Sequence, residues 1–156
     1  MNFLILPEGE LVLNSNMDEA DREVASIYVD ELTQLGILQP AEGELLANCP
    51  LFCVDKPDGT KRPIADMKRG GQNACIGKEP VYLIQKSTIL PQLYPGGSSA
   101  VADCSKQFHN FPTRKEERCY LGCIHPTTGQ KLVWVGLPMG SSNSPAIACR
   151  ITNSVL

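Results

Sequence analysis

The sequence predicts an α+β fold with a mostly antiparallel sheet and flanking helices. Three observations predict it: apolar residues at helical spacing near the N-terminus, two pairs of short apolar runs joined by turns rich in Gly and Pro, and a capped helix towards the C-terminus. The order helix, hairpin, helix, strand, hairpin, helix is typical of this class. At 156 residues with 42% hydrophobic residues, the chain is long enough for one domain or a large part of one.

Residues 1–15 are expected to form an irregular leader. The segment after it predicts an amphipathic helix from about Met17 to Leu35, with Asn16 as its N-cap and Gly36 as its end. Its apolar positions recur at helical spacing and are Val24, Ile27, Tyr28, Leu32 and Leu35. The other face of this helix is acidic, and nothing in the helix points to chemistry.

A basic hairpin is predicted after a linker at residues 37–50. Leu51–Val54 and Lys61–Asp66 are its expected strands, and Lys56–Thr60 is its turn, in which Pro57 fixes φ and Gly59 accepts a positive φ. Five cations fall within fourteen residues of this region and are Lys56, Lys61, Arg62, Lys68 and Arg69.

A short buried strand is predicted at residues 100–102, directly before Asp103. A carboxylate at the end of a buried strand is costly unless it has a partner. A hard cation such as Mg²⁺ is one such partner, because it prefers carboxylate oxygen. Between the hairpin and this strand, Val81–Leu93 could hold a short helix that is interrupted near Pro91.

A second hairpin and a helix complete the predicted elements. Residues 119–124 and 131–135 are the expected strands, joined by a turn at 126–129. Ser144 is a plausible N-cap with Pro145 at the first helical position, and the helix would run towards Val155. From Arg118 to Leu156 the sequence contains no Asp or Glu.

Charge is unevenly distributed along the chain. Residues 1–45 carry a net charge of −9, and residues 46–156 carry +6. This asymmetry suggests that the second part meets a polyanion, although an acidic surface helix followed by an ordinary mixed surface explains the same counts. No segment has the length or flanks of a membrane span or a signal peptide. The seven cysteines are therefore interpreted as reduced thiols of an intracellular protein, cytoplasmic or nuclear rather than secreted.

Three segments, taken in order, resemble motifs of the reverse transcriptases of retroelements, in particular of retrotransposons. The family's fingers segment is similar to Val54-Asp-Lys-Pro-Asp-Gly-Thr-Lys-Arg-Pro-Ile-Ala-Asp66. Motif A, in which a catalytic Asp is followed five residues later by Phe or Tyr, is similar to Ala102-Asp-Cys-Ser-Lys-Gln-Phe-His109. Motif B is similar to Gly136-Leu-Pro-Met-Gly-Ser-Ser-Asn-Ser-Pro145. Each motif alone is weak, but their order and separation make the resemblance specific.

The resemblance implies a fingers-like region at residues 16–97 and a partial palm at residues 98–156. The polymerases of this family transfer nucleotides through two metal ions, which implies Mg²⁺ as cofactor. The implied partners are an RNA or DNA template–primer and deoxynucleotides. The family's third motif, Tyr/Phe-x-Asp-Asp, is expected to lie after the end of this chain. We therefore expect the chain alone to be catalytically incomplete and a C-terminal polymerase half to be its missing partner.

The family's chemistry also implies roles for the residues that match its motifs. Asp103 would be the catalytic carboxylate and a metal ligand, and the carbonyl group of Cys104 would add a further metal ligand. Lys56 and Arg62 would hold the triphosphate of the incoming nucleotide, since charge-assisted contacts to phosphate are strong.

The rest of the nucleotide site is implied in the same way. The ring of Phe108 would fill the space that a ribose 2′-hydroxyl needs and so favour deoxynucleotides. Met139 and Gly140 would lie against the incoming nucleotide and the template, because glycine permits close approach of the backbone. Asn143 and Ser144 would position this loop.

Each of these residues also has a structural interpretation. Asp103 could cap a turn, the basic cluster could be a solvated hairpin, and Phe108 could be a core aromatic. Two cysteine pairs with His125 could form a zinc site, although neither pair has the C-x2-C spacing of a knuckle; these pairs are Cys49-x3-Cys53 and Cys119-x3-Cys123. A Cys104/His109 nucleophile pair has no third member, and no role is assigned to His109.

Two other functions stay open at this point. The chain could be a non-catalytic remnant that binds nucleic acid through the +6 charge of residues 46–156. It could also be an unstable pseudogene product, because a palm sheet without its third-motif hairpin would expose a strand edge and an apolar face.

Overall fold

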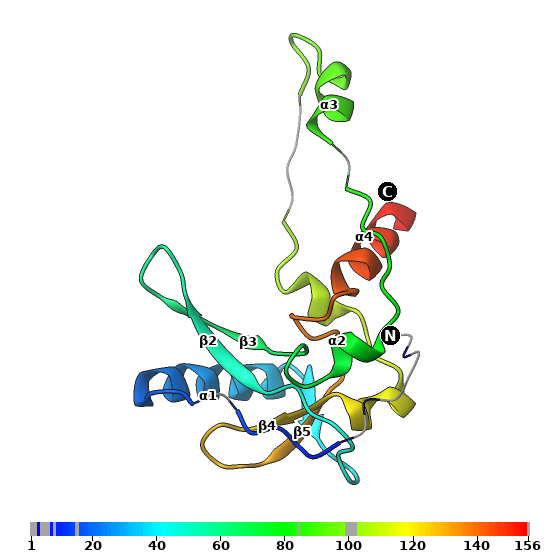
Figure 1. The fold of residues 1–156 in the computed structure, drawn as a ribbon. Helices are drawn as coiled ribbons and strands as arrows, with labels where there is room; N and C mark the ends of the chain where they lie inside the picture. The colour runs from blue at the N-terminus through cyan, green and yellow to red at the C-terminus, as the bar shows by residue number, and fades with distance from the viewer. Residues whose placement is uncertain are drawn as a thin grey trace.

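The computed structural model describes residues 3, 7, 9–14, 16–83, 85–98 and 103–155. Its helices are α1 (Glu19–Gln34), α2 (Gln72–Cys75), α3 (Lys86–Ile89) and α4 (Ser144–Val155), with 3₁₀-helices η1 (Leu90–Gln92), η2 (Gln107–Asn110) and η3 (Lys115–Tyr120). Its strands are β1 (Leu38–Pro40), β2 (Leu51–Asp55), β3 (Lys61–Ala65), β4 (Gly122–Ile124) and β5 (Lys131–Trp134). All pairings between these strands are antiparallel, so the predicted α+β class is confirmed (Figure 1).

The first helix ends as predicted but begins with a different cap. Asp18, not Asn16, is the N-cap, and its carboxylate accepts a hydrogen bond of 2.7 Å from the backbone N–H of Asp21. Gly36 has a φ of 71° and ends the helix. An Asp at the N-cap satisfies an unpaired N–H group and also interacts favourably with the helix dipole.

The buried face of α1 is rotated from the predicted one. Its buried residues are Ala25, Val29 and Leu32, at the i, i+4, i+7 spacing of one helix face. Ile27 and Leu35 were expected on this face but are 60% and 57% exposed. The reason is that α1 packs on β1 and on the hairpin of β2 and β3, which meet the face centred on Val29.

The basic hairpin forms as predicted and lies along α1 (Figure 1). β2 and β3 pair in a register that runs from Leu51 opposite Ala65 to Asp55 opposite Lys61. The backbone N–H of Lys56 donates to the carbonyl of Thr60 at 2.7 Å and closes the turn. Gly59 has a φ of 79°, which an L side chain rarely adopts.

A second sheet has the strand order β1-β5-β4 and joins distant parts of the chain. Residues 38–40 were predicted to be linker, and this prediction was wrong: Leu38 is fully buried and pairs with Trp134 of β5. A strand of three residues is too short to show a periodicity. The strand predicted at 119–124 is limited to Gly122–Ile124, because η3 takes up the residues before it. The turn at 126–129 and the strand after it form as predicted.

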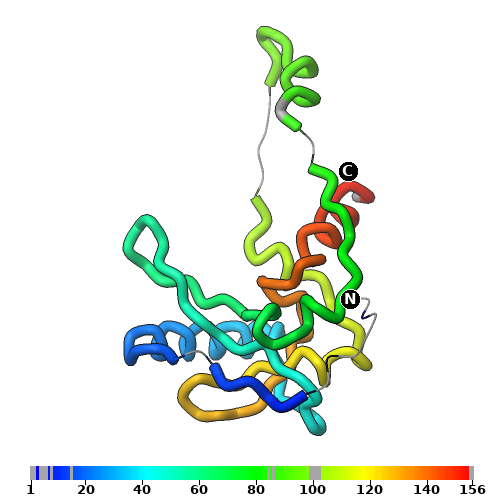
Figure 2. The backbone as a smooth tube through the Cα atoms, viewed as in Figure 1, coloured from blue at the N-terminus to red at the C-terminus, as the bar shows by residue number. Residues whose placement is uncertain are grey.

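One hydrophobic core lies between the two sheets and α1. Its residues come from α1, from both sheets and from the segments between them, and are Val29, Leu32, Leu38, Cys49, Leu51, Ala65, Met67, Ile76, Leu121, Cys123, Leu132 and Trp134. The N-terminal segment 9–14 runs along this body (Figure 2) and is held by the side chain of Asn48, which bonds both the N–H and the carbonyl of Val12 at 2.7 Å.

The segment that carries α3 and η1 stands apart from this body (Figure 1). The short helix predicted in Val81–Leu93 is confirmed by α3, and Pro91 falls in η1. The strand predicted at residues 100–102 lies outside the described residues. None of the helices in the described part of the chain is both long and apolar enough to cross a membrane.

Candidate functional site

The hairpin end carries three cations in different surroundings. The ammonium group of Lys61 lies 2.5 Å from the carboxylate of Asp21 and 3.7 Å from that of Asp55, and the hydrogen bond to Asp21 raises the pKa of Lys61. Among the described residues, neither Lys56 nor Arg62 forms an ion pair, and Lys56 has only a minor electrostatic interaction with the Asp58 carboxylate. Of these three cations, the two that the family's motif assigns to the triphosphate are thus the ones that no ion pair holds.

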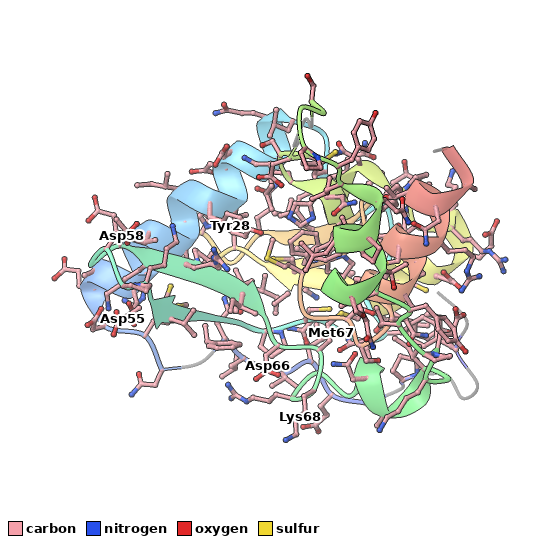
Figure 3. All side chains as sticks on the ribbon, turned by 90° about the horizontal axis from the view of Figure 1, so that it is seen from above. Tyr28, Asp55, Asp58, Asp66, Met67 and Lys68 are labelled. Carbon is pink, nitrogen blue, oxygen red and sulfur yellow. The ribbon has the colours of Figure 1, made fainter. Side chains whose placement is uncertain are left out.

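The turn that carries Lys56 has a fixed shape. The carboxylate of Asp58 accepts hydrogen bonds from the backbone N–H of Thr60 at 2.9 Å and from its hydroxyl group at 2.6 Å. These bonds lower the pKa of Asp58. Figure 3 shows Asp55 and Asp58 at the outer end of the hairpin, and Asp66 and Lys68 at its inner end.

The inner end of the hairpin packs against the motif B loop. Gly140 has a φ of 124°, and a Cβ atom on it would lie less than 3.0 Å from the backbone carbonyl oxygen of Ala65. The side chain of Asn73 clamps the same loop: its amide donates to the carbonyl of Gly140 at 2.9 Å and accepts from the N–H of Ser142 at 2.9 Å. The close approach expected at Gly140 therefore takes place, in this structure, against β3.

Asn143 and Ser144 are buried and hydrogen-bonded to the main chain. The side chain of Asn143 accepts from the N–H of Glu79 at 3.1 Å and donates to the carbonyl of Gly77. The Ser144 hydroxyl donates to the carbonyl of Pro138 at 3.1 Å. The N-cap prediction for Ser144 was wrong: α4 begins at Ser144, and Asn143 precedes it, with its carbonyl accepting from Ile147 N–H at 3.0 Å.

The motif A residues lie on the surface near η2. Asp103 and Cys104 are exposed, and Phe108 is half-buried within η2. Met139, in the motif B loop, is also half-buried. The amide of Gln107 donates to the hydroxyl of Thr152 in α4 at 3.1 Å, so the motif A segment is attached to the motif B helix.

A metal site is not assembled by the part of the chain that is described. It contains no group of three His, Cys, Asp or Glu residues that could hold a metal ion. Neither the magnesium ligands Asp103 and Cys104 nor the cysteine pairs considered for zinc are therefore joined by further ligands there. The ring of His125 instead lies 3.2 Å from the carboxylate of Asp30 and accepts from the N–H groups of the 126–129 turn.

Two residues of the site region were assigned no role from the sequence. His109, the last residue of the motif A segment, is buried and contacts motif B, although no periodicity or spacing marks it. Asn73, which holds the motif B loop, lies 67 positions before the glycine that it contacts. Only a match to an aligned family position could have pointed to it, because its contact is entirely non-local.

Comparison with known proteins finds similar sequences and similar solved structures. No family model matches the sequence. The chain is 28% identical over 121 residues to the Pro-Pol polyprotein of simian foamy virus type 1, a match that covers 78% of this chain and 10% of that polyprotein. The chain thus spans about a tenth of the length of this curated relative.

Solved foamy virus enzymes share the fold. A foamy viral protease-reverse transcriptase in complex with double-stranded DNA superposes with a TM-score of 0.68 at 21% identity, over 100% of this chain and 25% of that one. A prototype foamy virus protease-reverse transcriptase mutant superposes with a TM-score of 0.72 at 23% identity, over 96% of this chain and 19% of that one. In its motifs and in its fold, this chain is therefore similar to part of a retroelement reverse transcriptase, as the sequence predicts.

Proposed function

We propose that this chain forms the fingers and the first part of the palm of an RNA-directed DNA polymerase from a retrotransposon-type element. One observation carries the proposal: the motif B segment contacts both other motifs. Its loop packs on the hairpin through Gly140 and Ala65, and its helix is bonded to the motif A segment through Thr152 and Gln107. Three motifs that are separate in sequence are thus in contact in the fold.

The proposed partners are a template–primer duplex and deoxynucleotides. The related foamy viral enzyme was solved with double-stranded DNA, and residues 46–156 of this chain carry a net charge of +6. Lys56 and Arg62 would contact phosphate, since neither forms an ion pair among the described residues. Because all seven cysteines are free thiols, we place this function inside the cell.

Of the remaining site residues, some would contact the nucleotide and others would hold the motif B loop in place. Phe108 would be the sugar gate, and Met139 would lie against the nucleotide. Gly140 would hold the loop on the hairpin, since its backbone meets Ala65. Asn143 would act through the loop, because its side chain is already bonded to the backbone of residues 77 and 79.

Mg²⁺ is the metal that the family implies, and the described residues do not fit it by themselves. Asp103 and Cys104 are exposed, and no third ligand joins them in the described part of the chain. Two divalent ions need several oxygen ligands. The proposal therefore assigns no catalysis to this chain alone and assigns the missing carboxylates to another polypeptide segment.

The proposal is tested by binding of the chain to a fluorescent RNA template with an annealed DNA primer, across a salt series. The double substitution Lys56→Ala/Arg62→Ala should weaken binding about tenfold at low salt and lower the salt slope by about 2, because two phosphate contacts are lost. Lys115→Ala/Lys131→Ala removes the same charge elsewhere and should change affinity less than twofold. Equal effects of the two double variants would contradict the hairpin's role.

A second candidate function is non-catalytic binding of nucleic acid, which the net charge of +6 on residues 46–156 favours. The effect of added nucleotide on the affinity for the duplex distinguishes the two candidate functions. If the chain is polymerase-derived and retains its nucleotide site, dGTP complementary to the template should tighten binding of the duplex, and mismatched dATP should not. A duplex affinity that ignores every nucleotide supports the binding remnant.

A further inference from the structure

His109 occupies the junction of three segments. It follows Phe108 in η2, and its side chain is only 6% exposed. Its Nδ1 lies 2.8 Å from the carbonyl oxygen of Leu137, near the start of the motif B segment. Its Nε2 lies 3.3 Å from the hydroxyl of Tyr28 in α1. One ring thus joins motif A, motif B and the helix behind them.

The two partners determine where the proton sits. A carbonyl oxygen can only accept, so Nδ1 carries the hydrogen and donates to Leu137. In a neutral ring Nε2 is then an acceptor, and the Tyr28 hydroxyl donates to it. Burial lowers the pKa of His109, and burial raises the pKa of Tyr28 to about 12, so both groups are uncharged near neutral pH.

Packing fixes the same residue from the other sides. The imidazole stacks on the indole of Trp134, with ring centroids 5.4 Å apart and planes 23° apart. A Cβ atom on Gly136 would lie less than 3.0 Å from the backbone carbonyl oxygen of His109, so the two backbones touch. The ring and the backbone of His109 therefore cannot move without losing these contacts.

The turn before His109 is held as well. The backbone N–H of His109 donates to the carbonyl of Lys106 at 2.9 Å. Lys106 has a φ of 52°, the one positive φ outside glycine among the described residues. Its ammonium group lies 2.5 Å from the carboxylate of Glu31 in α1. A left-handed residue in a non-glycine position persists where the surroundings hold it, and here an ion pair and the anchored histidine do so.

We propose that His109 is a positioning residue, whose bonds to Leu137 and Tyr28 set the position of Phe108 relative to motif B. This inference rests on the proposed function, in which Phe108 gates the sugar of the incoming nucleotide. It deepens that function by naming a residue that sets the deoxynucleotide preference without touching the nucleotide. The Tyr28 hydroxyl is its second component.

The position of Phe108 can be read directly by ¹⁹F NMR. The chain has four phenylalanines, so uniform 4-fluorophenylalanine labelling gives four signals, which Phe→Leu variants assign. Tyr28→Phe removes one hydroxyl, and His109→Asn keeps an N–H donor near the Nδ1 position but removes the ring. Both should shift the Phe108 signal and leave the signal of Phe52, in β2, unchanged. Tyr82→Phe is the matched control, since Tyr82 is 79% exposed.

The protonation state supplies an independent readout. In ¹⁵N spectra His109 should be the Nδ1–H tautomer, and its titration should move the Phe108 signal below pH 6.5. The charged and titratable groups that face the pair are Glu31 from α1, Lys106 from the preceding turn and Cys123 from β4. Burial raises the pKa of Cys123 to about 12, far from this range. An Nε2–H tautomer, or a Phe108 signal unmoved by both Tyr28→Phe and His109→Asn, would overturn the proposal.

The link to sugar preference is measured with the same probe. In the wild type, dGTP added with template–primer should move the Phe108 signal at several-fold lower concentration than GTP, and Tyr28→Phe should reduce that ratio at least threefold. An unchanged ratio contradicts the role in sugar preference. If neither nucleotide moves the signal in the wild type, the gate assigned under the proposed function fails, while the tautomer and the variant shifts still decide whether His109 positions Phe108.

Discussion

The backbone carbonyl oxygen of Ala65 and the α-carbon of Gly140 are so close that a Cβ atom on Gly140 would lie less than 3.0 Å from that oxygen. Ala65 ends the basic hairpin, and Gly140 lies in the motif B loop. The hairpin that carries Lys56 and Arg62 and the loop that carries Met139 are thus joined backbone to backbone. A change at this contact should affect both.

Gly140→Ala should be strongly destabilising. The φ of 124° strains any L residue, and the added methyl group overlaps the Ala65 carbonyl. Together these effects should cost about 3 kcal/mol or more of the unfolding free energy, measured by urea denaturation. Gly43→Ala is the control, since open space surrounds that position and the change should be close to neutral. Equal unfolding midpoints for the two variants would contradict the contact.

Asn143→Ala distinguishes a structural side chain from a nucleotide ligand. Its amide group bonds the N–H of Glu79 and the carbonyl of Gly77, and the residue is 2% exposed. Removing it leaves both backbone groups without partners, at about 1–3 kcal/mol for each group that stays buried. The thermal midpoint should therefore fall by several degrees. Asn153→Ala, at an exposed position of α4, should not lower it. A normal midpoint with lost nucleotide binding would instead favour direct contact.

The sequence predicts the local features of this site well. Pro57 and Gly59 define the hairpin turn by their φ preferences alone, and the turn forms as expected. The apolar spacing defines α1, and Gly36 marks its end. The motif matches likewise depend only on neighbouring residues. In each case the determining interaction lies within a few positions along the chain.

What the sequence does not predict depends on distant partners. Gly140 is recognisable as a close-approach glycine, but its partner Ala65 is 75 positions away. The sequence places Leu38 in a linker, because its pairing with Trp134 depends on a strand almost a hundred positions away. His109 is assigned no role because its three contacts, to Tyr28, Leu137 and Trp134, come from three separate segments. Such contacts leave no period or spacing in the sequence.

Acid should destabilise the chain through His109. Burial lowers its pKa in the folded state below the ordinary value of 6.5. As the pH falls through 6.5, the unfolded state binds a proton that the folded state does not, so the contribution is complete above 6.5 and is lost below it. The slope is at most about 1.4 kcal/mol per pH unit. His109→Asn should flatten the unfolding free energy between pH 7 and 5.5 relative to the wild type, whereas a parallel profile would contradict the assignment.

Alkali should destabilise the chain through two buried thiols. Burial raises the pKa of Cys123 to about 12 and raises that of Cys49 well above the usual 9.0. The backbone N–H of Cys49 donates to the carbonyl of Gly122 at 2.8 Å, so the two thiols belong to adjoining parts of the core. Both remain protonated in the folded state where they would ionise in the unfolded chain.

The direction in which the unfolding free energy changes with pH follows from the number of protons bound in the folded and unfolded states. Below pH 9 both states hold the thiol protons and the contribution is constant; above pH 9 the unfolded state loses them first, and stability falls as the pH rises towards 12. Each thiol adds a slope of about 1.4 kcal/mol per pH unit at most. Tyr28, with its pKa raised to about 12, adds a further loss above pH 10.

The measurement is the urea unfolding free energy at pH 8, 9.5 and 10.5 under reducing conditions. Cys49→Ala/Cys123→Ala lowers stability at every pH because it leaves small cavities, but its decline with pH should be shallower than that of the wild type. Cys104→Ala, which removes an exposed thiol, should retain the wild-type decline. If the double variant and the Cys104→Ala variant decline in parallel, the two core thiols do not govern the alkaline limit.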